Sequence, residues 1–193
     1  KERIPEDKIA ELVAFGIPMV VTSEVFDSYG RSRGGPVQAT RLERETVPQS
    51  LLDSFYPLPE DFDLGPLASW VELMEETRET RQINVSRLHD AGITILAGSD
   101  VQSGVFPGPS LHRELHNLVD SGLSPLEAIR AATLYPARYL EEDEDPTFGV
   151  IGVGKRADLI LVEGDPTRDV GVLENLNVVL LKGVPIMRTP VAR

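Results

Sequence analysis

The stretch that decides the fold reads Leu88-His-Asp-Ala-Gly-Ile-Thr-Ile-Leu-Ala-Gly-Ser-Asp100. It contains the end of a helical pattern, a glycine at Gly92 that can cap the helix, and a short apolar strand at 93–97. Asp100 follows the strand almost at once. A helix, a glycine and an apolar strand in this order form one step of an alternating α/β architecture.

The same order occurs once before in the chain. Residues 5–16 predict a helix that ends at Gly16, and the apolar run at 17–23 predicts a strand. Residues 24–67 are rich in Gly and Pro, so we expect a long irregular insertion with at most a short helix around 51–55. Such an insertion can be a functional loop or a surface loop with no role in catalysis or binding, and the sequence leaves both open.

The chain after Asp100 first continues as helices and then changes to β structure. Residues 68–91, which precede the strand at 93–97, predict one long helix, and apolar residues between 111 and 119 predict another. Ser124 and Glu127 form a capping-box pattern that starts a further helix, which Pro136 should interrupt. Strands are predicted at 157–163 and in a hairpin around Gly183.

Composition excludes several classes of protein. The chain has 193 residues, with 19 Lys and Arg against 31 Asp and Glu, a net charge of −12 and no Cys. An acidic chain with a pI near 4.7 is not expected to bind nucleic acid, and the lack of Cys excludes disulfides and Cys-based metal sites. No apolar run reaches the ~18 residues of a membrane span. The chain begins at Lys1, so an N-terminal signal cannot be assessed and the location is unknown, with the cytoplasm as the default.

Two positions could carry chemistry. Asp100 would lie at the carboxyl end of a parallel strand, where α/β sites gather, but an acid there caps a loop about as often as it binds a ligand. His112 and His116 are spaced i, i+4 and could share one metal, or they could be boundary histidines beside a Leu stripe. The pattern is not that of a zinc protease, because Arg113 follows the first His. His112 is our candidate substrate-binding residue.

The order of the segments resembles metal-dependent amidohydrolases, in particular imidazolonepropionase-like members. The resemblance rests on five stretches in the same order: Leu88 to Asp100, Leu111-His-Arg-Glu-Leu, Gly122-Leu-Ser-Pro-Leu-Glu-Ala-Ile-Arg-Ala-Ala-Thr133, Gly152-Val-Gly-Lys-Arg-Ala-Asp-Leu-Ile-Leu-Val-Glu-Gly-Asp-Pro166 and Val178-Val-Leu-Leu-Lys-Gly-Val-Pro-Ile186. Residues 8–23 are similar to the segment around the seventh barrel strand.

The resemblance implies an α/β fold that comprises the C-terminal portion of a (β/α)8 TIM-like barrel and a small β-sandwich segment. The barrel part would be residues 1–146, with the insertion at 24–67, and the β-sandwich segment residues 147–193. The resemblance also implies a divalent metal, with zinc as the first expectation, and Asp100 as metal ligand and catalytic base. The substrate would be a small amide or cyclic amide, and an oligomeric full-length parent is compatible with it.

The sequence departs from the family in its metal ligands. It has no His-x-His pair and no Lys at the end of a mid-barrel strand, and one carboxylate cannot hold a zinc ion that usually takes three protein ligands. A whole barrel also needs about 250 residues. We therefore expect the C-terminal segment of a hydrolase, inactive by itself. The alternative is a non-catalytic acidic α/β module, or a remnant that lacks the metal site.

Overall fold

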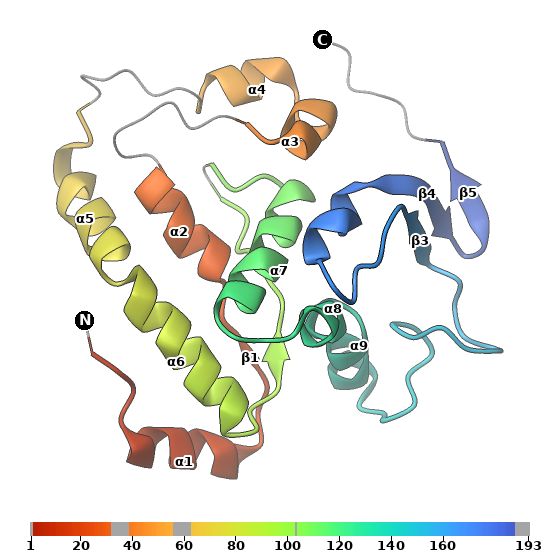
Figure 1. Ribbon diagram of the computed structural model, residues 1–193, viewed down its shortest axis with the longest axis horizontal. Helices are drawn as coiled ribbons and strands as arrows, with labels where there is room; N and C mark the ends of the chain where they lie inside the picture. Colours follow the sequence, from red (N-terminus) through yellow and green to blue (C-terminus); the bar gives the residue numbers. More distant parts are fainter. Residues whose placement is uncertain (1, 32–38, 56–62, 103, 188–193) are drawn as a thin grey trace.

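A two-stranded parallel sheet lies at the centre of the fold. In the computed structural model, which describes residues 2–31, 39–55, 63–102 and 104–187, β1 (Met19–Val20) pairs with β2 (Ile95–Leu96) (Figure 1). The register joins Met19 to Ile95 and Val20 to Leu96. Each strand is shorter than the apolar run that predicted it. Both strands point the same way, so their carboxyl ends, which lead to Thr22 and Asp100, lie at one edge of the sheet.

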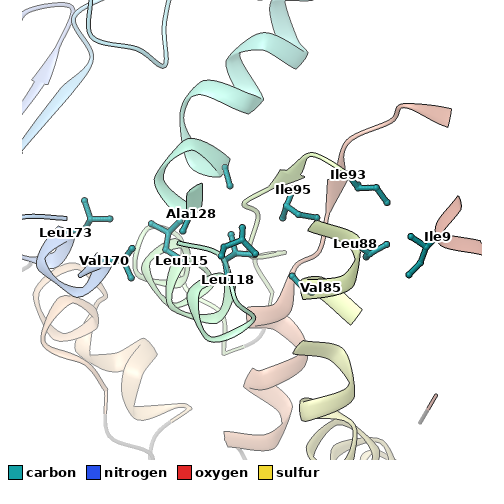
Figure 2. Packing of buried hydrophobic residues seen from close by; sticks show 12 residues of the cluster. Ile9, Val85, Leu88, Ile93, Ile95, Leu115, Leu118, Ala128, Val170 and Leu173 are labelled. Atoms are coloured by element: carbon teal, nitrogen blue, oxygen red, sulfur yellow. The ribbon is translucent and has the colours of Figure 1, made fainter. Parts of the chain in front are cut away.

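The main hydrophobic core surrounds β2. Its members come from helices that are distant in the sequence and from the start of the C-terminal region, as Figure 2 shows. The buried residues of this cluster are Ile9, Val85, Leu88, Ile93, Ile95, Leu115, Leu118, Leu123, Ala128, Ala131, Val170 and Leu173. Because the core takes side chains from both sides of the 24–67 insertion and from the C-terminal region, these parts fold as one packed unit.

Two helices outside the insertion, α1 and α8, have the end and the start that their capping residues predict. Helix α1 (Glu6–Phe15) ends at Gly16, which has φ +63°. Helix α8 (Pro125–Ala132) starts with the Ser124–Glu127 capping box, and α9 (Leu134–Glu141) restarts after Thr133. Between the strand β2 and α8 lies α7 (Pro109–Asp120). It packs against α2 (Ser23–Arg31), α8 and η2 (Val170–Glu174).

The insertion is helical in its described part, so the expectation of an irregular segment over 24–67 is wrong there. It contains α2 (Ser23–Arg31), α3 (Arg41–Thr46), α4 (Gln49–Asp53) and η1 (Gly65–Leu67). The physical reason is that α2, α3 and α4 each bury an apolar side chain: Val25, Leu42 and Leu52 are almost wholly buried. Residues 32–38 and 56–62 lie outside the described part.

The long helix expected over 68–91 is also two helices. Helix α5 (Ala68–Glu76) ends at Thr77, and α6 (Arg78–Asp90) follows directly. The Thr77 hydroxyl donates a hydrogen bond to the carbonyl of Leu73, at 2.6 Å, and Arg81 donates to the same hydroxyl, at 2.9 Å. Side-chain hydrogen bonds to the backbone of the preceding turn often bend a helix.

The C-terminal region forms a three-stranded antiparallel sheet. Its order is β3 (Leu159–Val162), β4 (Leu176–Leu181) and β5 (Val184–Ile186), with η2 (Val170–Glu174) between β3 and β4. The predicted hairpin is confirmed, because Lys182 and Gly183 both have positive φ, as a two-residue turn of type I′ requires. Over the described residues the fold is mixed α/β, without a closed barrel or a second sheet of a sandwich.

Gly98, just after β2, lies close to Val20 of β1. A Cβ atom added there would lie 2.5 Å from Cγ1 of Val20. We therefore expect Gly98→Ala to lower the free energy of unfolding by about 1–3 kcal/mol, the usual cost of overpacking. Urea unfolding of the purified chain measures this. The double variant Val20→Ala with Gly98→Ala removes the clashing methyl group and should recover part of the loss. If Gly98→Ala alone is neutral, the close approach does not constrain the sheet.

Candidate functional site

Asp100 lies just past the carboxyl end of β2 and is exposed. Its φ of +49° places it in the left-handed region, which Asp tolerates better than most residues. Among the described residues no hydrogen bond or ion pair engages its side chain. Among the described residues the carboxylate is thus unengaged, and its role as a ligand stays a prediction.

The backbone around Asp100 is tied to the first turn of α7. The hydroxyl groups of Ser99 and Ser110 are 2.9 Å apart and share a hydrogen bond, and Ser110 is buried. On the following loop, Gln102 donates to the Tyr29 hydroxyl of α2 at 3.0 Å. Phe106 packs edge-on against Phe55, with 5.6 Å between the ring centres. The insertion therefore supports the loop that follows Asp100.

The end of β1 is held by a buried carboxylate from α7. Glu114 has no exposed surface, and its two oxygens accept hydrogen bonds from the backbone N–H of Ser23 and of Glu24, at 3.1 and 2.6 Å. Burial raises the pKa of Glu114 to about 7, against the opposing effect of these two hydrogen bonds. The residue just before them, Thr22, has φ +46°, which is unfavourable for a β-branched side chain.

One buried carboxylate of the insertion pairs within α2, and another pairs with an arginine of α7. Arg31 pairs with Glu24, and Arg113 pairs with Glu43, at 2.9 Å. Glu24 and Glu43 are both almost fully buried, and burial raises the pKa of Glu24 despite its partner Arg31. These residues were not found in the sequence, although Thr40 and Glu43 form the capping box that starts α3, and that pattern is readable.

The cavity beside these ion pairs is separate from Asp100. It has a volume of about 570 Å³, and its walls come mainly from α2, α5, α6 and α7, including Arg31, Arg113 and His116. Asp100 is not among its lining residues. The cavity therefore adds nothing to the predicted chemistry at the strand ends.

His112 and His116 are placed against η2. His112 is half-buried, its Nδ1 has no hydrogen-bond partner, and burial lowers its pKa while the charge of Glu174 opposes that effect. A Cβ added to Gly171 of η2 would lie 3.4 Å from Cε1 of His116. In the part of the chain that the structure describes, no third ligand joins the two histidines. The role of His112 in substrate binding stays a prediction.

A match along most of the sequence shows the family of this chain. The pattern of the amidohydrolase family matches residues 37–187, which is most of the chain. The chain belongs to the amidohydrolase family. No match is found among curated proteins.

Solved amidohydrolase structures and related enzymes share the fold. One amidohydrolase is 19% identical with a TM-score of 0.65, and the match covers 96% of this chain and 38% of the amidohydrolase chain. A Xaa-Pro dipeptidase with methionine bound in its active site is 22% identical with a TM-score of 0.61, over 95% of this chain and 37% of its own. An ochratoxinase from A. niger is 23% identical with a TM-score of 0.63, over 94% of this chain and 35% of its own.

This amidohydrolase chain thus spans less than two fifths of the length of each of these structures. Members of the family generally use divalent metal ions, which the protein must bind through several side chains. Over residues 2–31, 39–55, 63–102 and 104–187, no three His, Asp or Glu side chains come together as a metal site. Asp100 offers a single unengaged carboxylate, which can supply one metal ligand but not a full set of ligands.

In the same ranges, no helix has the length and apolar character needed to cross a membrane.

The buried acid of α7 makes stability depend on pH. Folding raises the pKa of Glu114 from about 4.5 to about 7, so between these values the folded state binds more protons than the unfolded state. The free energy of unfolding of this amidohydrolase chain should therefore fall as pH rises through this window, by roughly 3 kcal/mol at most. Urea unfolding at several pH values measures it.

Two variants serve as controls for this pH dependence. Glu114→Gln stays neutral, so its unfolding free energy should lose most of this slope. Glu127 has a lowered pKa, because Ser124 donates to it, so Glu127→Gln should remove stability at neutral pH and none in acid. A Glu114→Gln variant that keeps the full slope would refute the assignment to Glu114.

Proposed function

We propose that this chain forms the C-terminal part of a metal-dependent hydrolase that cleaves C–N bonds in small amides or cyclic amides. The single observation that supports the proposal best is Asp100, an exposed and unengaged carboxylate at the carboxyl end of β2 in a member of the amidohydrolase family. The resemblance to imidazolonepropionase-like members supports amides or cyclic amides as the substrate class.

Asp100 would bind the metal and act as the general base. A bound divalent metal lowers the pKa of its water toward ~7 and polarises a carbonyl oxygen. A carboxylate beside it can accept the proton of that water and deliver it to the leaving amine. Zinc is the metal we propose, and its remaining ligands would come from residues outside this chain.

The surroundings of Asp100 suit this role. The Ser99–Ser110 hydrogen bond fixes the backbone next to Asp100. The loop at 101–110 and the insertion at 24–67 contact each other through Gln102 with Tyr29 and Phe106 with Phe55. We propose that these two segments, with His112, contribute to substrate selection. The substrate itself would be a small molecule, as for hydrolases of this family.

The test uses the protein that carries this chain together with the rest of a barrel. Replacing Asp100 by Asn removes the proton acceptor and a charged metal ligand with little change in shape. We expect turnover of amide substrates to fall by at least about 100-fold, the usual contribution of a general base. Metal content, measured by mass spectrometry, should fall as well, while the unfolding transition stays unchanged.

A matched control is Asp7→Asn, which alters an exposed acid in α1. It should leave turnover and metal content as they are. If Asp100→Asn keeps full turnover, Asp100 is not the general base, and the proposed mechanism is wrong.

A further inference from the structure

The cavity lined by α2, α5, α6 and α7 has the size of a small-molecule site. Its volume is about 570 Å³, and Asp100 is not among its lining residues. Sites for small molecules are usually clefts of about 300–1,000 Å³ in which a few polar groups fix the orientation of the ligand. The polar groups of this cavity therefore indicate the chemistry of the molecule that it would accept.

Asn117 of α7 gives the first indication. Its residue lines the cavity and is more than nine-tenths buried, with 7% of its surface exposed. Its Nδ2 has no hydrogen-bond partner among the described residues. A buried N–H group without an acceptor is unfavourable, and folded proteins leave few such groups unpaired. The Asn117 side chain therefore predicts an acceptor that comes from outside the chain.

Arg31 of α2 brings a second donor to the same cavity. Its terminal nitrogens, Nη1 and Nη2, both donate to the carboxylate of Glu24. Its Nε is buried as well, and in the described part of the chain it has no hydrogen-bond partner. Guanidinium and amide N–H groups both bind carboxylate oxygens, and the guanidinium does so with the assistance of its charge. A carboxylate is thus the acceptor that suits both donors.

The arginines of α6 add positive charge to this wall. Arg78 and Arg81 line the cavity, and both pair with one carboxylate, that of Asp27, at 3.0 and 2.6 Å. Two guanidinium groups on one carboxylate carry a net positive charge, which also favours an anionic group in the ligand.

Other groups of the lining oppose a plain anion. The carboxylates of Asp120 and Glu174 line the cavity, and no hydrogen bond or ion pair of the described residues engages them. Negative charge there disfavours a ligand that carries a carboxylate alone and favours one that also carries a cation. Phe26 and Met74 add apolar side chains to the wall.

We propose that this cavity binds a small zwitterion with an apolar body, such as an amino acid with an aliphatic side chain. The ligand carboxylate accepts hydrogen bonds from Asn117 and Arg31, and the ammonium group lies toward Asp120 and Glu174. The site is separate from Asp100, so the proposal does not depend on the proposed hydrolase activity.

The experiment is an NMR titration of the purified chain with L-leucine, up to about 10 mM, which detects dissociation constants of about 1 mM. It follows the Nδ2 proton signals of Asn117 and the Nε proton signal of Arg31. We expect both to shift in a saturable way with one common dissociation constant.

Two ligands with matching aliphatic chains test the two charges separately. Isocaproate lacks the ammonium group of leucine, and isoamylamine lacks its carboxylate. Each should bind at least about 10-fold more weakly than leucine, because each loses hydrogen bonds between charged groups.

Variants assign the binding to named side chains. Asn117→Asp keeps the shape but replaces the donor by a carboxylate, so leucine should bind at least about 10-fold more weakly. Asp120→Asn combined with Glu174→Gln should lose the preference for leucine over isocaproate. Asp7→Asn, in α1 and outside the cavity lining, is the control and should change neither property.

The wild-type titrations decide the matter even if a variant fails to fold. The proposal is overturned if leucine causes no saturable shift at Asn117 and Arg31, or if isocaproate or isoamylamine binds as tightly as leucine. It is also overturned if a folded Asn117→Asp variant binds leucine as the wild type does.

Discussion

The close approach of β1 and β2 is the constraint on which the rest of the structure depends. Each strand is only two residues long, so few backbone hydrogen bonds join them. Gly98 allows the contact with Val20, and the core around Ile95 packs β2 against helices on both sides. Because the two strands are parallel, their carboxyl ends meet at one edge, and Asp100 is presented there.

Helix α7 fixes both strand ends at this edge. Its first turn meets Ser99 beside Asp100, and Glu114, one turn later, meets the amides that follow β1. Burying a carboxylate is costly unless hydrogen bonds satisfy it. Here the effect of burial outweighs that of two such bonds and raises the pKa of Glu114 to about 7. Helix α7 thus contacts the chain beyond both strands, through Ser110 at Ser99 and through Glu114 at Ser23 and Glu24.

Local patterns predicted much of the fold, because their causes lie within a few residues. The Ser124–Glu127 capping box and the hairpin at Gly183 need only their neighbours, and both are present. The position of Asp100 just past a strand was predicted for the same reason, and its role as a metal ligand stays a prediction. The chain's membership of the amidohydrolase family, predicted from the order of five stretches, is confirmed over residues 37–187.

The parts that the sequence did not predict depend on distant partners. Glu114 looks like an ordinary helical residue until its acceptor role toward Ser23 and Glu24 is known, and Glu43 becomes a buried partner only when Arg113 approaches it. No Gly or Pro lies at the break at Thr77, so the local sequence did not predict it. Helices α2 and α3 owe their stability to burial against other helices, which a window of local sequence does not contain.

The proposed role of Asp100 as a metal ligand can be measured by anomalous X-ray diffraction at the zinc absorption edge. The crystals would be of the protein that carries this chain with the rest of a barrel. If Asp100 is a ligand, we expect an anomalous peak about 2.0–2.2 Å from one of its carboxylate oxygens, the usual zinc–oxygen distance. A peak coordinated only by other residues, with Asp100 turned away from it, would show that Asp100 does not bind the metal.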